Sequence, residues 1–294
     1  MTEKQFMNEV ADRLLNLEQT RGMDIQCQTL MKNNDTERHG IILQQKDNAV
    51  SPTIFLDRYY QQYLHEQISV EEVADCIVHI LEKVKDDSKK LSSLSLNYED
   101  CKDKIIYRLI SKTKNVSIRD KIPFIPFLDL MITFYIVIGY TETGVETLKI
   151  TNELMSDWNM TTADLFRLAE ENTPRIFPAR VESMTQMLER YFKMPEDKFM
   201  DLPMIVIGNE AGVYGASTLL YPHIVEELAE KIDSDFYALP SSVHEFIIVP
   251  GKDQSSLNEY SELVKHINEN YVDREEILSD HAYYYDRKEK KFIL

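Results

Sequence analysis

The chain has 294 residues, of which 43% are hydrophobic and 28% charged, a composition typical of a folded globular protein and not of a disordered one. Its 33 Lys and Arg against 50 Asp and Glu give a formal net charge of −17, which argues against nucleic-acid binding because phosphate contacts need clustered cations. The three cysteines have no CxxC spacing and the first residues do not resemble a secretory signal. Both observations predict a cytoplasmic protein without a disulfide framework.

The first third of the chain predicts a small unit with the element order αββ(β)αα. Apolar periodicity and turn residues indicate a helix over 3–18, strands over 23–31, 40–45 and 53–56, a helix begun by Asp57, and a helix over 70–84 opened by the capping box Ser69–Glu72. The polar stretch 83–95 predicts a linker. We therefore expect domains at 1–92 and 93–294, with one continuous domain as the alternative.

The middle of the chain contains its most apolar stretch. A helix is predicted over 98–112 from the spacing of its isoleucines and leucine. Residues 122–140 are long enough to suggest a membrane span, but two prolines and Asp129 interrupt them, and their β-branched and aromatic residues favour a buried strand or strand pair. A carboxylate among such residues needs a partner, and we expect Arg108, Arg119 or Arg175 to pair with Asp129.

The last third predicts a regular alternation of strands and helices. After a strand over 145–150 and helices near 161–172 and 184–191, we expect strands at 204–207, 213–220, 236–239 and 245–249, helices at 222–232 and 257–267, and a hairpin over 282–294. Asn172-Thr173-Pro174 is expected to end its helix. The resulting order ββαββαββ predicts an α+β fold, with helices packed on a mixed or antiparallel sheet.

Five stretches resemble a bacterial family that is known only as a domain of unknown function. They are FLDLMITFYIVI (127–138), NELMSDWNMTTADLFRLAEENTPRIFP (152–178), MIVIGNEAGVYGASTLLYP (204–222), LPSSVHEFIIVP (239–250) and LSDHAYYYD (278–286). The first hundred residues resemble that family only in element order. The resemblance implies no activity, cofactor or catalytic residue, and the gut bacteria in which such proteins occur fit a cytoplasmic location.

The turn at 240–244 holds the residue types of a nucleophile–base–acid relay. Ser241 or Ser242 would be the nucleophile and His244 the base, with Asp280 or His281 completing the set. The alternative is a plain hairpin turn, which proline and serine favour, and no GxSxG elbow is present.

Two further groups of residues are candidates for binding. Asn209, Glu210 and Tyr214 flank a glycine-containing loop that lacks the P-loop and GxGxxG patterns, so no cofactor is predicted and a strand connection is the alternative. Tyr284 lies in a run of three tyrosines, which are common at protein interfaces. We expect one of the three in the core and two partly exposed.

No histidine pair has the spacing of a known metal motif, although Asp280, His281 and Asp286 contain suitable ligands, so the sequence predicts no metal site. Taken together, the residues favour a binding protein without catalytic activity, with a protein partner and neither nucleic acid nor membrane. The alternative is a hydrolase that uses the cluster at 241–244 and 280–281.

Overall fold

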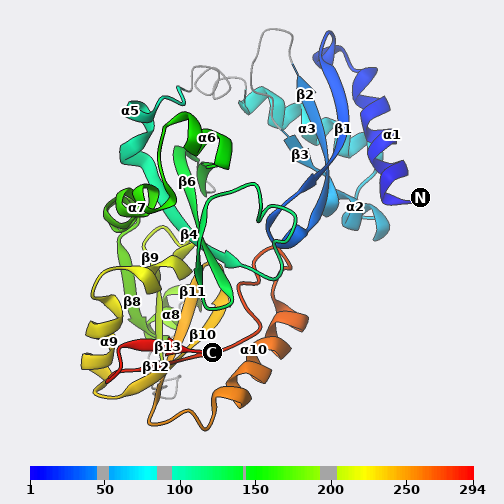
Figure 1. Ribbon diagram of the computed structural model, residues 1–294. Coiled ribbons are helices and arrows are strands. Elements are labelled where there is room, and N and C mark those ends of the chain that lie inside the picture. The colour runs from blue at the N-terminus through cyan, green and yellow to red at the C-terminus, as the bar shows by residue number, and fades with distance from the viewer. Residues whose placement is uncertain (45–52, 85–94, 142–143, 193–203) are drawn as a thin grey trace. The chain divides into compact units, whose positions relative to one another are not determined.

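The computed structural model describes residues 1–44, 53–84, 95–141, 144–192 and 204–294 (Figure 1). The chain divides into an N-terminal unit, Met1–Lys32 with Thr36–Ser95, and a C-terminal unit, Leu96–Leu294 with the turn Asn33–Asp35. Most of the predicted linker lies outside the described residues. Within them, no helix combines the length and the apolar character needed to cross a bilayer.

The N-terminal unit has the predicted element order. It consists of α1 (Glu3–Leu15), β1 (Asp24–Met31), β2 (Glu37–Gln44), β3 (Thr53–Phe55), α2 (Asp57–Leu64) and α3 (Val70–Val84). The strands form an antiparallel sheet in the order β1-β2-β3. The predicted capping box opens α3, because the Ser69 backbone N–H donates to Glu72 Oε2 at 2.8 Å and the Glu72 N–H donates back to Ser69 Oγ. Phe6 and Leu14 of α1, Ile41 of β2 and Ile77 of α3 are fully buried in its core.

The C-terminal unit begins with a four-stranded antiparallel sheet. After the short helix α5 (Tyr98–Cys101) come β4 (Ile105–Ser111), β5 (Phe124–Phe127), β6 (Leu130–Thr141) and β7 (Gly144–Lys149). β6 is central, with β4 on one edge and β5 and β7 in succession on the other. The prediction of a buried strand in the apolar stretch is therefore confirmed by β6, which is buried from Leu130 to Val137, whereas β5 is half-buried with Pro126 exposed.

The predicted helix over 98–112 is wrong, because only its first four residues are α-helical and Ile105–Ser111 form strand β4. All seven residues of β4 are buried. A strand covered on both faces shows no alternation of apolar and polar residues, so its continuous apolar run also fits a helical period. The β-branched isoleucines favour the strand.

The rest of the unit forms a six-stranded antiparallel sheet with the order β13-β12-β10-β11-β9-β8. Its strands are β8 (Ala179–Ser183), β9 (Ile205–Asn209), β10 (Asp235–Ser242), β11 (Glu245–Gly251), β12 (Tyr283–Asp286) and β13 (Lys291–Ile293). The helices are α6 (Asn152–Asp157), α7 (Thr162–Ile176), α8 (Met184–Phe192), α9 (Ile224–Ile232) and α10 (Leu257–Tyr271). Antiparallel sheets packed with helices confirm the predicted α+β class.

Helices cover both faces of the six-stranded sheet. Leu228 of α9 packs in one core cluster with Phe236 of β10, whereas Val264 of α10 packs in another with Tyr237, the next residue of the same strand. Neighbouring residues of a strand point to opposite faces, so the two helices lie on opposite sides. Tyr283, Tyr284 and Tyr285 of β12 are consequently all buried, at 0%, 3% and 3% exposure, and the prediction of two partly exposed tyrosines is wrong.

The segment predicted as a strand over 213–220 is the 3-10 helix η5 (Gly215–Leu220). Its first four residues, Gly-Ala-Ser-Thr, have little of the side-chain bulk that packs on a sheet. Their polar groups bond to neighbouring strands instead. Ser217 Oγ accepts the Leu109 N–H of β4 at 3.0 Å, and Thr218 Oγ1 donates to the Gly208 carbonyl at 2.9 Å.

Helix α7 continues through Pro174 to Ile176, so the predicted stop before this proline is also wrong. The last turns of α7 are held by bonds to the free edge of β4. The Tyr107 N–H donates to Thr173 Oγ1 at 3.1 Å, and Asn172 Nδ2 donates to the Ile105 carbonyl at 3.1 Å. These tertiary bonds outweigh the local preference of the residue that precedes a proline.

Stability of the C-terminal unit is expected to fall at high pH partly through Tyr221. This side chain is 6% exposed and donates its hydroxyl to the Phe177 carbonyl at 2.7 Å. Burial raises the pKa of Tyr221 from 10.0 to about 12. Because the pKa is higher in the folded state, this contribution to stability is complete below pH 10. It is lost as the pH rises toward 12, by about 2.7 kcal/mol. Urea unfolding followed by fluorescence of Trp158, the single tryptophan, should show a shallower pH dependence in Tyr221→Phe than in wild type.

Candidate functional site

Arg108 is the charged residue of strand β4, and it lies on the face of the sheet opposite Tyr107 and Leu109. Its neighbours come from the adjoining strand β6, from β7 on the far side of β6 and from the loop before η5. The guanidinium carbon lies 4.3 Å from the ring centroid of Tyr135 on β6 and 3.4 Å from that of Tyr214. Nη2 donates to Thr147 Oγ1 on β7 at 2.9 Å. We call these residues, together with Lys149, the Arg108 cluster.

The guanidinium of Arg108 is buried without a negative partner. The residue is 4% exposed, and its Nε is buried with no hydrogen-bond partner among the residues that the structure describes. Within the described part of the chain, no carboxylate forms an ion pair with it. Burial lowers the pKa of Arg108 and raises the pKa of Tyr135, so the phenol of Tyr135 stays neutral and does not supply the missing charge.

A second cation, Lys149, lies next to Arg108. Its Nζ is 5.8 Å from the ring centroid of Tyr135, its pairing partner across β6 and β7. Burial, and then the positive charge of Arg108, lower the pKa of Lys149, while Asp35 acts in the opposite direction. Burial acts to raise the pKa of Asp35, but hydrogen bonds from Ser117 and the charge of Lys149 outweigh it and lower that pKa. The site therefore holds two adjacent cations and one acid that Ser117 already engages.

The loop that carries Tyr214 is shaped by close backbone packing. Tyr214 has a left-handed backbone (φ 53°), and its N–H donates to His244 Nδ1 at 3.0 Å. Asn209 is buried and donates Nδ2 to the Val213 carbonyl at 2.8 Å, which closes the loop, while its Oδ1 has no partner. Of the three loop residues predicted to bind, Tyr214 belongs to the Arg108 cluster, Asn209 supports its loop and Glu210 is exposed.

His244 is held in one neutral tautomer by its neighbours. Nδ1 accepts the Tyr214 N–H, so the ring proton is on Nε2, which lies 3.5 Å from Glu276 Oε1. Ser242 Oγ accepts the backbone N–H of His244 at 3.0 Å, and Ser241 Oγ donates to Glu245 Oε1 at 3.5 Å. No hydrogen bond between either serine hydroxyl and the imidazole occurs among the described residues. In a nucleophile–base–acid relay a serine hydroxyl would bond to the imidazole, but here the hydroxyls and the ring bond to other groups.

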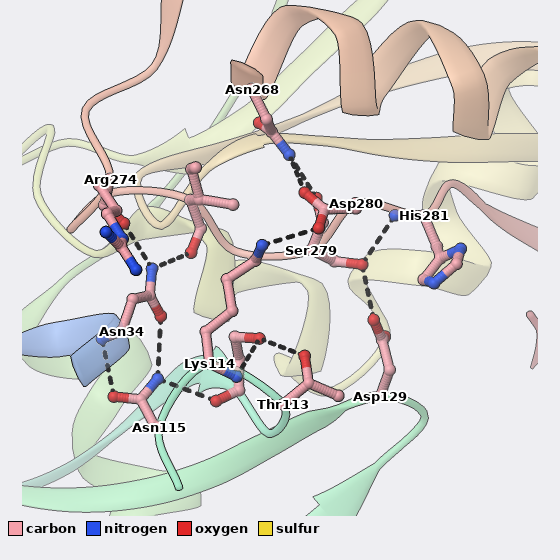
Figure 2. Close-up of polar contacts among 12 residues, drawn as sticks. Asn34, Thr113, Lys114, Asn115, Asp129, Asn268, Arg274, Ser279, Asp280 and His281 are labelled. Carbon is pink, nitrogen blue, oxygen red and sulfur yellow. Dashed lines mark hydrogen bonds and ion pairs between the residues drawn. The ribbon is translucent and has the colours of Figure 1, made fainter. Parts of the chain in front are cut away.

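Asp280 belongs to a separate polar network, drawn in Figure 2. It accepts Lys114 Nζ at 2.7 Å and Asn268 Nδ2 at 2.9 Å. Burial acts to raise the pKa of Asp280, but these two hydrogen bonds and the charge of Lys114 outweigh it and lower the pKa. The His281 ring is exposed, and its backbone N–H donates to Ser279 Oγ. Asp280 is thus a stabilised carboxylate in an ion pair.

Asp129 is partnered by hydroxyl groups. Its oxygens accept Ser279 Oγ at 2.7 Å and the Tyr283 hydroxyl at 2.6 Å, and the expected pairing with an arginine is wrong. Hydroxyl donors satisfy the carboxylate without burying a second charge. Burial and the nearby Asp129 carboxylate raise the pKa of Tyr283 well above its ordinary value. Tyr284 is also engaged, since its hydroxyl donates to Asp235 Oδ2 at 2.5 Å.

A polar cavity of about 550 Å³ lies beside this network, and both Lys114 and Asp35 line the cavity. The full lining is Asn34, Asp35, Thr113, Lys114, Asn268, Glu269, Val272, Arg274 and Ile277. Asp35 therefore borders the cavity and also acts on Lys149 of the Arg108 cluster. A small polar ligand would find ammonium, amide and carboxylate groups there.

The sequence pattern points to Tyr214 but not to Tyr135, Thr147 or Lys149, and it predicts Arg108 only as a partner of Asp129. One signal was present, because Arg108 interrupts an otherwise apolar run from Ile105 to Ile110. In the predicted helix over 98–112, Arg108 would point away from the face that carries the isoleucines and the leucine. In a strand buried on both faces, the same residue must be buried too.

Comparison with known proteins assigns the chain to a family whose function is unknown. Residues 3–287 match the family of unknown function DUF5688, and the chain belongs to that family. Neither the curated proteins nor the solved structures gave a match.

Proposed function

We propose that this protein is a binding protein whose C-terminal unit captures an oxyanion, the carboxylate or phosphate group of a small ligand, at the Arg108 cluster. The observation that carries the proposal is the burial of Arg108 beside Lys149. Arg108 is 4% exposed and, among the described residues, its Nε has no hydrogen-bond partner and no carboxylate forms an ion pair with its guanidinium. Buried charges in proteins are usually paired, and the missing partner of this one is an anion.

The energies support a missing partner. Removing a guanidinium from water costs several kcal/mol. Two ring contacts contribute about 1–2 kcal/mol each, and the neutral bond to Thr147 about 1 kcal/mol. An aromatic ring contacts a flat face of the planar guanidinium, whereas the N–H groups donate hydrogen bonds in the plane, along its edge. At that edge the N–H of Nε has no partner among the described residues. An oxyanion at that edge would form charge-assisted bonds, and Lys149 would add to the attraction.

The hydrolase alternative has weaker support. A nucleophilic serine must reach the base within hydrogen-bond distance. Ser242 instead accepts the backbone N–H of His244, and His244 Nδ1 is taken by Tyr214. These bonds stabilise a tight turn and provide no serine–imidazole pair for acyl transfer, so we prefer the binding function.

Calorimetric titration of the full chain tests the proposal, with sodium phosphate and sodium acetate as separate probes at constant ionic strength and chloride as the reference anion. We expect one of the two oxyanions to bind at a single site. Lys149→Gln and Arg108→Met should each weaken its binding at least tenfold, because each removes a cation from the site. Lys231→Gln removes an exposed lysine of α9 in the same unit and should bind like wild type.

The unfolding free energy of Arg108→Met, measured without ligand, shows whether Arg108 serves ligand binding or stabilises the fold. Arg108→Met removes the stabilising Thr147 bond and ring contacts, and it also removes a buried unpaired charge, which is destabilising. Because the two effects oppose each other, we expect its unfolding free energy to stay within about 1 kcal/mol of wild type. If Arg108→Met does not fold, Lys149→Gln carries the test alone. Unchanged oxyanion affinity in Lys149→Gln, or no oxyanion binding by the wild type, would refute the proposal.

A further inference from the structure

Three potential metal ligands meet in the N-terminal unit, and none of them belongs to a site discussed above. Glu3 is the first residue of α1, His39 lies on β2 and Asp57 is the first residue of α2. Their ligand atoms all lie within 4.8 Å of one another, and each residue is half-buried. Backbone bonds hold the arrangement, since the Leu56 N–H donates to the His39 carbonyl at 2.8 Å immediately before Asp57.

The spacing of Glu3 and His39 fits two ligands of one metal ion better than a direct hydrogen bond. His39 Nδ1 lies 3.4 Å from Glu3 Oε1. Hydrogen bonds between nitrogen and oxygen are usually about 2.9–3.0 Å long. Two ligands bound at about 2.0–2.1 Å with a tetrahedral angle lie roughly 3.3 Å apart.

Asp57 supplies a second, independent observation. Its Oδ2 is buried and has no hydrogen-bond partner among the described residues, and Arg38 Nη1 lies 3.9 Å from the other oxygen. Asp57 was expected to cap helix α2, but the cap residue is Leu56 and no side-chain cap bond forms. Both acids gain some stabilisation from the first turn of a helix. That effect explains neither the imidazole beside them nor the unpartnered oxygen.

We propose that Glu3, His39 and Asp57 bind a divalent transition-metal ion, with Zn²⁺ as the best match. Zn²⁺ binds both histidine nitrogen and carboxylate oxygen with tetrahedral geometry, and three protein ligands leave a fourth position open. The nitrogen ligand disfavours Mg²⁺ and Ca²⁺, which prefer oxygen. The ion would link α1, β2 and α2, three elements that are distant in sequence. This site is independent of the proposed oxyanion site.

The test uses the full chain after treatment with a chelator and dialysis. Calorimetric titration with Zn²⁺ should show a single site of micromolar or tighter affinity, with Mg²⁺ at least a hundredfold weaker. His39→Asn and Asp57→Asn should each weaken Zn²⁺ binding at least tenfold. Zn²⁺ should also raise the melting temperature of wild type but not of these variants, because binding to the folded state stabilises it.

The matched control is His79→Asn, which removes an exposed histidine of α3 in the same unit. Cys76→Ser removes an exposed thiol of the same helix that could bind zinc adventitiously. Both controls should bind Zn²⁺ like wild type. If His39→Asn does not fold, Glu3→Gln, at the start of α1, replaces it. Wild-type affinity in Glu3→Gln or Asp57→Asn, or loss of binding in Cys76→Ser, would overturn the proposal.

Discussion

Replacing Gly215 by alanine is expected to destabilise the C-terminal unit by about 3 kcal/mol, the upper range for added bulk in a tightly packed site. A Cβ on Gly215 would lie 2.4 Å from the His244 carbonyl oxygen, 2.7 Å from the Asn209 amide nitrogen and 3.0 Å from the Gly208 Cα. All three are backbone atoms, which cannot move aside as a flexible side chain would. Urea unfolding followed by Trp158 fluorescence measures the loss.

Gly212 provides the matched control in the same loop. It has a left-handed backbone (φ 68°), but a Cβ there meets no atom within 4 Å. Gly212→Ala should therefore lose only about 1 kcal/mol, the cost of placing an L-residue in this conformation. Equal losses in the two variants would mean that the close backbone packing around Gly215 does not account for its cost.

Asn34→Ala is expected to cost the C-terminal unit about 3 kcal/mol, because buried polar groups lose their partners. Figure 2 shows the Asn34 amide among backbone and side-chain groups. Nδ2 donates to the carbonyls of Arg274 and Ile277 at 2.8 and 2.6 Å, and Oδ1 accepts Asn115 Nδ2 at 2.9 Å. Asn34 is 3% exposed, so water cannot readily replace these bonds.

Asn34→Gly separates the side-chain bonds from the backbone conformation. Asn34 has φ 59°, a left-handed value that glycine adopts without strain. The glycine variant should lose about 2 kcal/mol, the part that belongs to the hydrogen bonds. If Asn34→Gly unfolds at the same urea concentration as wild type by Trp158 fluorescence, the amide network does not stabilise the unit.

Most elements with a distinct period or a clear turn could be predicted from the sequence. The hairpin around the NNDTER turn and the box Ser69–Glu72 are local signals, and the structure confirms both. Predictions failed where tertiary contacts decide the local structure, as two examples show. The 105–111 strand is buried on both faces and shows no alternation, and α7 passes Pro174 because Asn172 and Thr173 bond to the edge of β4.

The candidate sites were harder to predict, because their residues are distant in the sequence. Arg108 and Lys149 are brought together by the pairing of β4, β6 and β7, and Tyr214 joins them from a loop of another sheet. Glu3, His39 and Asp57 match no spacing motif, since each comes from a different element. The turn at 240–244 did contain a motif-like set of residues, but turn geometry accounts for their hydrogen bonds.

The oxyanion site at Arg108 is tested most directly by anomalous diffraction from crystals of the full chain grown with sodium selenate, whose selenium marks the position of the oxyanion. The account predicts a strong anomalous peak with oxygens at about 2.7–3.2 Å from the guanidinium edge of Arg108, on the side of Lys149. Crystals in which a carboxylate of the chain itself occupies that edge, or in which the edge is empty at saturating selenate, would contradict it.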